Sequence, residues 1–179
     1  MKLLPITRHS RLQASIGVES NGPTMSAGDR ALLNEPLLGL VASRECPGSV
    51  LLATLDLVPV WASAGRVIVS GFHSPLEQQV LRSLLRRQGR VVKVLARGFG
   101  DLYVDCRPTL EEREPLASGR MLIISAFANS VARTTRATAL ARNRLVLALA
   151  TDIVVPHVAA GSPLEALVAE YQKQQAAVE

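Results

Sequence analysis

The sequence predicts an α/β fold, and three observations support that expectation. Short β-branched runs alternate with helical stretches along most of the chain, as they do in βαβ units. Hydrophobic residues make up 48% of the sequence and aromatic residues only 3%, a composition typical of buried parallel strands and the helices that cover them. The length of 179 residues suits one domain with a full core.

The first two strands and the helices that follow them are predicted within residues 37–87. The run 37–42 predicts a strand, and 49–64 predicts a helix that Pro59 is expected to kink or break. Residues 66–69 predict the second strand. A serine N-cap and a proline at the first helical position then begin a helix over 75–87.

The second half of the chain repeats this alternation. The expected elements are a strand over 91–96, a helix over 110–117, a strand over 121–124, a helix over 131–150, a strand over 153–155 and a helix over 164–174. Strands and helices at this spacing imply right-handed crossovers. We therefore expect a Rossmann-like three-layer sandwich with a mostly parallel sheet of at least five strands.

The N-terminal segment does not share this pattern. Residues 1–30 mix Arg, Ser, Gly, Asn and Pro, which predicts a poorly structured arm or a small accessory β addition. Residues 31–179 are expected to form the single Rossmann-like domain. No stretch stays apolar for the roughly 20 residues of a membrane span, so a cytoplasmic protein is expected. Cys46 and Cys106 lack C-x-x-C spacing, which argues against a metal site or a redox pair, and no cofactor is expected.

The charge balance points to an acidic partner. The formal net charge is +5 and the pI about 9.9. Arg supplies most of the positive charge, and its planar fork suits bidentate contacts with phosphate. A nucleic acid or a nucleotide therefore fits as partner, although Arg and Ala also fill the surfaces of proteins from GC-rich genomes.

Small, hydroxyl-bearing and basic residues follow the predicted strands. In parallel sheets, ligands bind beyond the carboxyl ends of the strands. Small residues let the backbone approach a ligand closely, whereas hydroxyls and Arg bind anions. An anion or phosphate cradle is therefore predicted, the alternative being that Ser and Gly only serve the turns. The strand-end residues are Ser43, Arg44, Ser70, Gly71, His73, Arg97, Gly98, Ser125, Gly161 and Ser162.

No catalytic group is predicted. The chain has neither a Walker sequence nor a G-x-G-x-x-G after the first strand. Ser70 and His73 lack the G-x-S-x-G pattern and lie too close together for a hydrolase triad. We interpret His73 as a residue that begins a helix or contacts the ligand. Glu165 is interpreted as a partner of a helix dipole or as a ligand contact.

The arginines near the predicted last crossover helix face different ways. At 100° per residue, Arg133, Arg136 and Arg144 fall within roughly an 80° arc of an uninterrupted helix, and Arg142 points the opposite way. Arg142 and Arg144 are therefore expected to have different roles. One would face the strand-end cleft and the other a surface or partner, unless both are solvated ends of a buried helix.

Four motifs, in their order along the chain, resemble those of the DprA/Smf family of DNA-processing proteins. This family lies within the superfamily that also holds the LOG-type nucleotide phosphoribohydrolases. The most specific is Arg142-Asn143-Arg144-Leu145 with Asp152-Ile153-Val154-Val155, which resembles the family's R-N-R-I-I-A-x-L-S-D segment. The resemblance covers about residues 37–170. The other matches are Gly39-Leu40-Val41-Ala42-Ser43-Arg44 for G-x-x-G-S-R, Val69-Ser70-Gly71 for V-S-G, and Gly161-Ser162-Pro163-Leu164-Glu165-Ala166 for G-S-x-x-T-A.

This resemblance implies a homodimeric protein that binds single-stranded DNA in a basic pocket at the strand ends and hands it to a recombinase. The family usually has A-x-G-I-D after V-S-G, and this chain has Phe72-His73-Ser74-Pro75 there instead. We expect a divergent stand-alone member without the C-terminal winged-helix module of the family. The ligand-site candidates carried over are Ser43, Arg44, Ser70, Gly71, Arg142 and Arg144, with Asn143 orienting the arginines.

Two other functions stay open. The pocket could sense a small nucleotide, or cleave its N-glycosidic bond as LOG-type enzymes do. Those enzymes use P-G-G-x-G-T-x-x-E, of which Gly161-Ser162-Pro163-Leu164-Glu165 keeps the glutamate. The scarcity of aromatic residues favours such a pocket over a platform on which bases stack. The chain could also be a scaffold that acts only through a dimer or partner surface. A binding function is expected in preference to a catalytic one.

Overall fold

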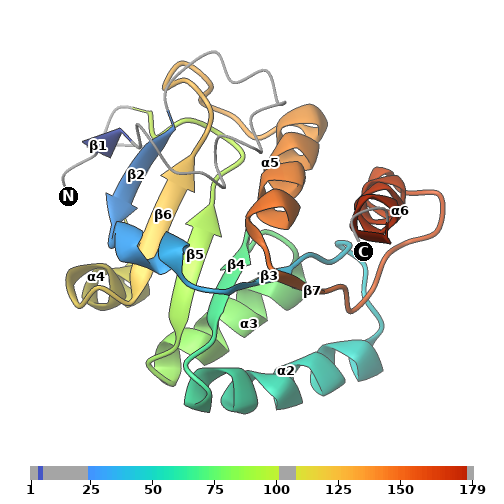
Figure 1. Ribbon diagram of the computed structural model, residues 1–179, viewed down its shortest axis with the longest axis horizontal. Helices are drawn as coiled ribbons and strands as arrows, with labels where there is room; N and C mark the ends of the chain where they lie inside the picture. The colour runs from blue at the N-terminus through green and yellow to red at the C-terminus, as the bar shows by residue number, and fades with distance from the viewer. Residues whose placement is uncertain (1–3, 6–23, 101–107, 177–179) are drawn as a thin grey trace.

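Seven strands form one sheet in the computed structural model, which describes residues 4–5, 24–100 and 108–176 (Figure 1). Their order across the sheet is β1-β2-β6-β5-β4-β3-β7. The five strands from β6 to β7 pair in parallel, whereas β2 pairs antiparallel with both β6 and β1. This confirms the predicted mostly parallel sheet. The strands are β1 Leu4–Pro5, β2 Met25–Gly28, β3 Leu37–Leu40, β4 Val67–Ser70, β5 Arg90–Val94, β6 Met121–Ser125 and β7 Asp152–Val154.

Helices cover both faces of the sheet and make the predicted three layers (Figure 1). Successive strand residues point to opposite faces, so Leu37 packs in one hydrophobic cluster and Leu38 in the other. One face carries α2 Gly48–Ser63, α3 Pro75–Arg86 and α4 Leu110–Ala117, and the other carries the 3-10 helix η1 Arg30–Asn34, α5 Arg136–Leu149 and α6 Pro163–Ala176.

Two helices differ from their predicted form. α2 continues through Pro59 instead of breaking there, because Pro59 is exposed and water can solvate the carbonyl that loses its partner. The helix begins at Gly48, one residue before the predicted start, and its N-cap is Pro47. α5 begins at Arg136 rather than near residue 131, because Thr135 caps it and accepts a hydrogen bond from the Thr138 N–H at 3.2 Å.

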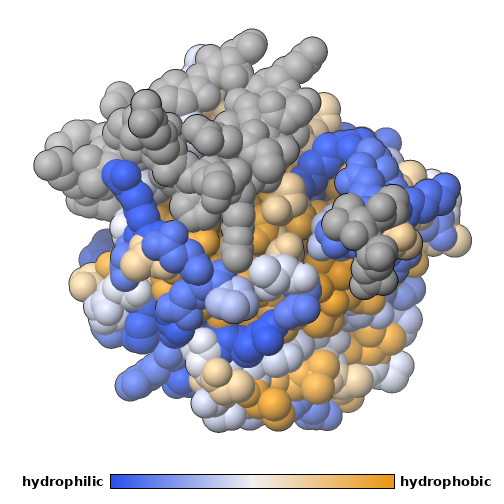
Figure 2. All heavy atoms as spheres, in the orientation of Figure 1, coloured by the Kyte–Doolittle hydropathy of each residue, from blue (hydrophilic) through white to orange (hydrophobic). Residues whose placement is uncertain are grey.

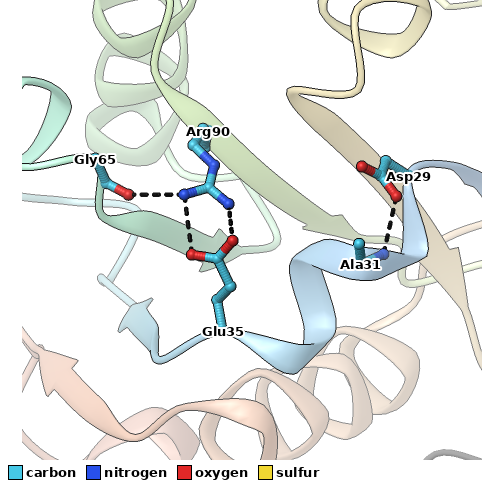
Figure 3. A network of polar contacts seen from close by, with 5 residues as sticks. All are labelled: Asp29, Ala31, Glu35, Gly65 and Arg90. Carbon is cyan, nitrogen blue, oxygen red and sulfur yellow. Dashed lines mark hydrogen bonds and ion pairs between the residues drawn. The ribbon is translucent and has the colours of Figure 1, made fainter.

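Ion pairs and caps hold the amino ends of the strands together (Figure 3). The Arg90 guanidinium at the start of β5 donates to both carboxylate oxygens of Glu35 and, at 3.2 Å, to the Gly65 carbonyl. Asp29 caps η1 by accepting from the Ala31 N–H at 2.9 Å. These contacts fix the edge of the sheet opposite the strand ends where a ligand is expected.

The structure describes the N-terminal segment only in part. Residues 25–28 of the N-terminal segment form β2, while 6–23 and Cys106 lie outside the described residues. None of the helices in the described part is long and apolar enough to cross a membrane. Apolar side chains gather over α2 in the lower part of Figure 2, where Leu52, Leu57 and Val60 are exposed.

Candidate anion-binding site

The strand order reverses at β3, which has β4 on one side and β7 on the other. Such a switch point is where α/β sheets usually bind ligands. Here the loops that follow β3 and β7 are tied together by Ser43. Its N–H donates to the His157 carbonyl at 3.0 Å, and its hydroxyl accepts from the Ala159 N–H at 2.9 Å. Ser43 therefore has a structural role, and the open polar groups lie one strand further along, beyond β4.

The chain turns sharply after β4. Ser70 is fully buried, and its hydroxyl accepts from the Phe72 N–H at 3.1 Å. Phe72 has a φ of 47°, an uncommon left-handed conformation for a bulky residue, and its ring is buried. The turn leaves Gly71 facing α5 without a side chain between them.

Arg142 fills the space beside Gly71. A Cβ added to Gly71 would lie 1.2 Å from Nη1 and 2.0 Å from Cζ of Arg142, so the guanidinium lies directly against this glycine. α5 runs back along the strands that it connects, and long side chains tilt toward a helix's N-terminus, which carries this guanidinium to the carboxyl edge of the sheet.

The Arg142 side chain is 5% exposed, and its Nε is buried without a hydrogen-bond partner. Among the described residues, no ion pair or hydrogen bond to its guanidinium is found. Burial lowers the pKa of Arg142 from its ordinary value, and the Glu77 carboxylate acts in the opposite direction. A buried charge without a direct partner is destabilising, so a site that keeps one is a candidate for binding an anion.

Glu77 joins the loops after β3 and β4. Its Oε1 accepts from the Ala42 N–H at 3.0 Å, and its Oε2 accepts from the N–H groups of His73 at 2.8 Å and Ser74 at 3.2 Å. Glu77 is 3% exposed, and its own N–H donates to the Ser74 hydroxyl at 3.3 Å, completing the capping box of α3. The carboxylate thus holds three backbone donors from two loops.

His73 and Arg44 lie in exposed positions on these two loops. Partial burial, followed by the positive charges of Arg142 and Arg44, lowers the pKa of His73, and Glu77 acts in the opposite direction. The four groups therefore sense one another electrostatically. At neutral pH the imidazole is mainly uncharged, and the positive charge of the site comes from the two arginines.

The remaining candidates from the sequence have other surroundings. Arg144 is exposed on the opposite side of α5 and forms an ion pair with Glu170 of α6 at 3.0 Å. Half-buried Asn143 lies between the two arginines on the helix. The Arg97 carbonyl accepts from the Ser125 hydroxyl at 2.7 Å, which ties the ends of β5 and β6. Arg142 and Arg144 thus have different environments, and their different roles stay a prediction.

The last predicted segment begins α6. The Glu165 carboxylate accepts from the Gly161 N–H at 2.6 Å, and the Glu165 N–H donates to the Ser162 hydroxyl at 3.2 Å. Gly161 has a φ of 72°, which favours glycine. Gly161, Ser162 and Glu165 thus hydrogen-bond to one another and cap the start of α6.

The sequence reasoning did not include Glu77 among the site residues. It identified only the local helix start, a serine N-cap followed by a proline at the first helical position. The contact from Glu77 to Ala42 depends on the parallel pairing of β3 with β4, which brings the ends of both strands to one place. The predicted parallel sheet places the strand ends at one edge, but it does not say which carboxylate joins the two loops.

Comparisons with known proteins agree with this fold. A family model described as DNA recombination-mediator protein A matches residues 23–177. Among curated proteins, none matches the chain. The chain is similar to the X-ray structure of DNA processing protein A from Streptococcus pneumoniae, at 17% identity and a TM-score of 0.73, covering 97% of this chain. It spans 60% of the length of that protein.

A second similar structure comes from Helicobacter pylori. It is described as giving insights into the single-stranded DNA binding mode of that organism's DNA processing protein A. The identity is 21% and the TM-score 0.74, covering 97% of this chain and 79% of that one. At these identities the two likenesses establish the shared fold.

Proposed function

The chain belongs to the DNA recombination-mediator protein A family, and we propose that it is a DNA-processing protein that binds single-stranded DNA at the carboxyl edge of its sheet. Arg142 receives a phosphate at the base of the site, and Arg44 contacts the strand at the rim. His73 lies beside them on the loop after β4. The site binds the strand and does not cleave it.

The observation that carries this proposal is the buried guanidinium of Arg142 beside Gly71. Its Nε lacks a partner, and a phosphate oxygen would supply the missing charge-assisted hydrogen bond. An uncompensated buried charge of this kind destabilises the free protein and is relieved by an anionic ligand. Single-stranded DNA is the ligand named for the H. pylori relative, and it presents phosphates of the required charge.

No feature of the site favours the hydrolase alternative. The glutamate that a LOG-like reaction would need corresponds to Glu165, and its carboxylate accepts a backbone hydrogen bond in the α6 cap. Glu77, the buried carboxylate near Arg142, holds three backbone N–H groups. Both carboxylates are thus occupied as hydrogen-bond acceptors, and binding is the function that the geometry supports best.

Two further parts of this proposal concern assembly. The family resemblance implies that the protein forms a homodimer and delivers its DNA to a recombinase. Light scattering with and without an oligonucleotide tests the first part. Copurification with a recombinase on a DNA-coated support, repeated with Arg142→Met, tests whether the second depends on the same site.

The test of DNA binding compares two arginines of one helix. Fluorescence anisotropy with a labelled oligothymidine, measured over a series of salt concentrations, gives the Kd and its salt slope. Arg142→Met is expected to weaken binding roughly tenfold or more and to lower the salt slope by about 0.7, the value for one phosphate contact on a single strand. Arg144→Met removes the same charge from the opposite side of α5, where Glu170 pairs with it, and is expected to weaken binding several-fold less.

Two results would remove the proposal. The first is an unsubstituted protein that does not bind the oligonucleotide at low salt. The second is an equal loss of affinity in Arg142→Met and Arg144→Met, because binding would then follow the net charge of the protein rather than this site.

A further inference from the structure

The Glu77 carboxylate forms different contacts from those of an ordinary partner of a buried arginine. A carboxylate near a guanidinium usually forms a bidentate pair with it and occupies its donors. Here no ion pair joins Glu77 to Arg142 in the described part of the chain, although the two interact electrostatically. The oxygens of Glu77 instead accept from the backbone of Ala42, His73 and Ser74.

We infer that Glu77 is the positioning residue of the anion site: it fixes the loops that carry Arg44 and His73, and it compensates the charge of Arg142 without occupying its donors. This inference rests on the proposed function. Glu77 belongs to the capping box of α3, and capping requires no bond to the loop after β3. The inference therefore gives Glu77 a second role. The Ala42 N–H, 35 positions earlier in the chain, is the contact that capping does not explain.

The role has a physical consequence that separates it from simple electrostatics. Glu77→Gln removes a negative charge from beside the bound phosphate, so Coulomb's law alone predicts tighter binding. Glutamine, however, has one acceptor oxygen where glutamate has two, and its NH2 group would face an N–H of one loop. If Glu77 positions the site, the loops separate and binding weakens instead. The sign of the change in affinity therefore decides between the two accounts.

The experiment combines amide hydrogen exchange with oligothymidine binding. In Glu77→Gln, exchange at Ala42 or at His73 and Ser74 is expected to become roughly tenfold faster or more, because a hydrogen bond to a charged acceptor is lost. The Kd is expected to rise by a similar factor, with a salt slope smaller by about 0.7 because the phosphate contact of Arg44 is lost when its loop moves. In an Arg44→Met background, Glu77→Gln should weaken binding much less, because Glu77 acts through the loop that carries that arginine.

Glu112→Gln is the matched control. Glu112 is likewise a buried capping-box carboxylate, on α4, where it accepts from the Thr109 N–H at 3.0 Å and from the Lys93 ammonium at 2.6 Å. Its substitution is expected to lower the Tm and leave the affinity for the oligonucleotide unchanged. A fall in stability by itself is thereby separated from a loss of positioning.

Each outcome bears on a different claim. Equal or tighter binding by Glu77→Gln, or unchanged exchange at all three amides, overturns the positioning role while the proposed function stands. Absence of binding by the unsubstituted protein removes the proposed function and this role together, and it is seen before any variant is compared. If the single variant does not fold, exchange at the same amides in the Arg142→Met background decides whether Glu77 joins the loops.

Discussion

Gly71→Ala is the smallest change that should empty the anion site. The added Cβ would lie 1.2 Å from Nη1 and 2.6 Å from Nε of Arg142. The guanidinium must therefore move by roughly 2 Å to regain van der Waals separation. Gly71 lies outside the left-handed region, so alanine adds no backbone strain. The displaced group is the end of a flexible side chain, which can swing toward water and recover hydration.

The expected result is a protein of nearly unchanged stability that binds DNA poorly. Replacing glycine by alanine stabilises by about 0.4–1 kcal/mol through the unfolded state where the native backbone allows it. The lost contact between Arg142 and a phosphate is worth about 1.5–3 kcal/mol, which corresponds to affinity weaker by roughly 10- to 150-fold. Oligothymidine anisotropy gives the affinity, and thermal unfolding by circular dichroism gives the stability.

Gly48→Ala is the control for this substitution, because a Cβ there meets no atom within 4 Å. Its affinity for DNA should equal that of the unsubstituted protein. In a double-mutant cycle, Gly71→Ala should add little to the loss caused by Arg142→Met, since both remove one contact. Unchanged affinity in Gly71→Ala, or two fully additive losses, would show that the guanidinium beside Gly71 does not bind the ligand.

Three further outcomes are expected. Arg142→Met should raise the stability by about 1–2 kcal/mol, and the Tm by roughly 2–8 °C, because it replaces a buried guanidinium that lacks a hydrogen-bond partner by an apolar chain, while Glu77 keeps its three backbone donors; a lower Tm would mean that the guanidinium is structural. DNA affinity should rise as the pH falls through and below the ordinary imidazole pKa of 6.5, since a bound phosphate raises the lowered pKa of His73 and favours its protonation; His73→Gln should abolish this dependence, and equal pH profiles would refute it. The hydrogen bond from Arg90 lowers the pKa of Glu35, so the ionised Glu35 carboxylate stabilises the fold at pH values above its ordinary pKa of 4.5. This stabilisation is lost as the pH falls through the lower pKa of the folded state. The difference in stability between the unsubstituted protein and Glu35→Gln should therefore vanish in acid, as chemical denaturation at several pH values can show.

Much of the fold could be predicted because its signals are local and mutually consistent. The start of α3 follows from Ser74 and Pro75, whose capping and φ preferences act within one turn of helix. The start of α5 was misplaced because the segment before Thr135 has no residue that forbids helix, and only the reciprocal bonds of Thr135 and Thr138 end the loop. Pro59 was overestimated because its effect depends on which side of the helix it occupies, which the local sequence does not reveal.

The site was harder to predict because its contacts join distant segments. The sequence separates Arg142 from Arg144 by helical periodicity, and this split matches their environments, one buried and one paired with Glu170. Periodicity could not say which arginine faces the sheet, since that depends on the register of α5 over the strands. Nor could it predict that Ser43 would be taken up by the loop after β7, because a hydroxyl at a strand end serves a ligand or a neighbouring loop equally well.

The charges at the site suggest how binding is achieved. At neutral pH, Arg142 and Arg44 are positive, Glu77 is negative and His73 is mainly uncharged, so the local excess is a single positive charge. Long-range attraction from so small an excess is weak and is screened by salt beyond about 8 Å. Affinity must then come mainly from short, directed hydrogen bonds of a guanidinium already desolvated and held beside Gly71. For such a site, the position of Arg142 matters more than the number of positive charges around it, which is why removing the negative charge of Glu77 is expected to weaken binding rather than strengthen it.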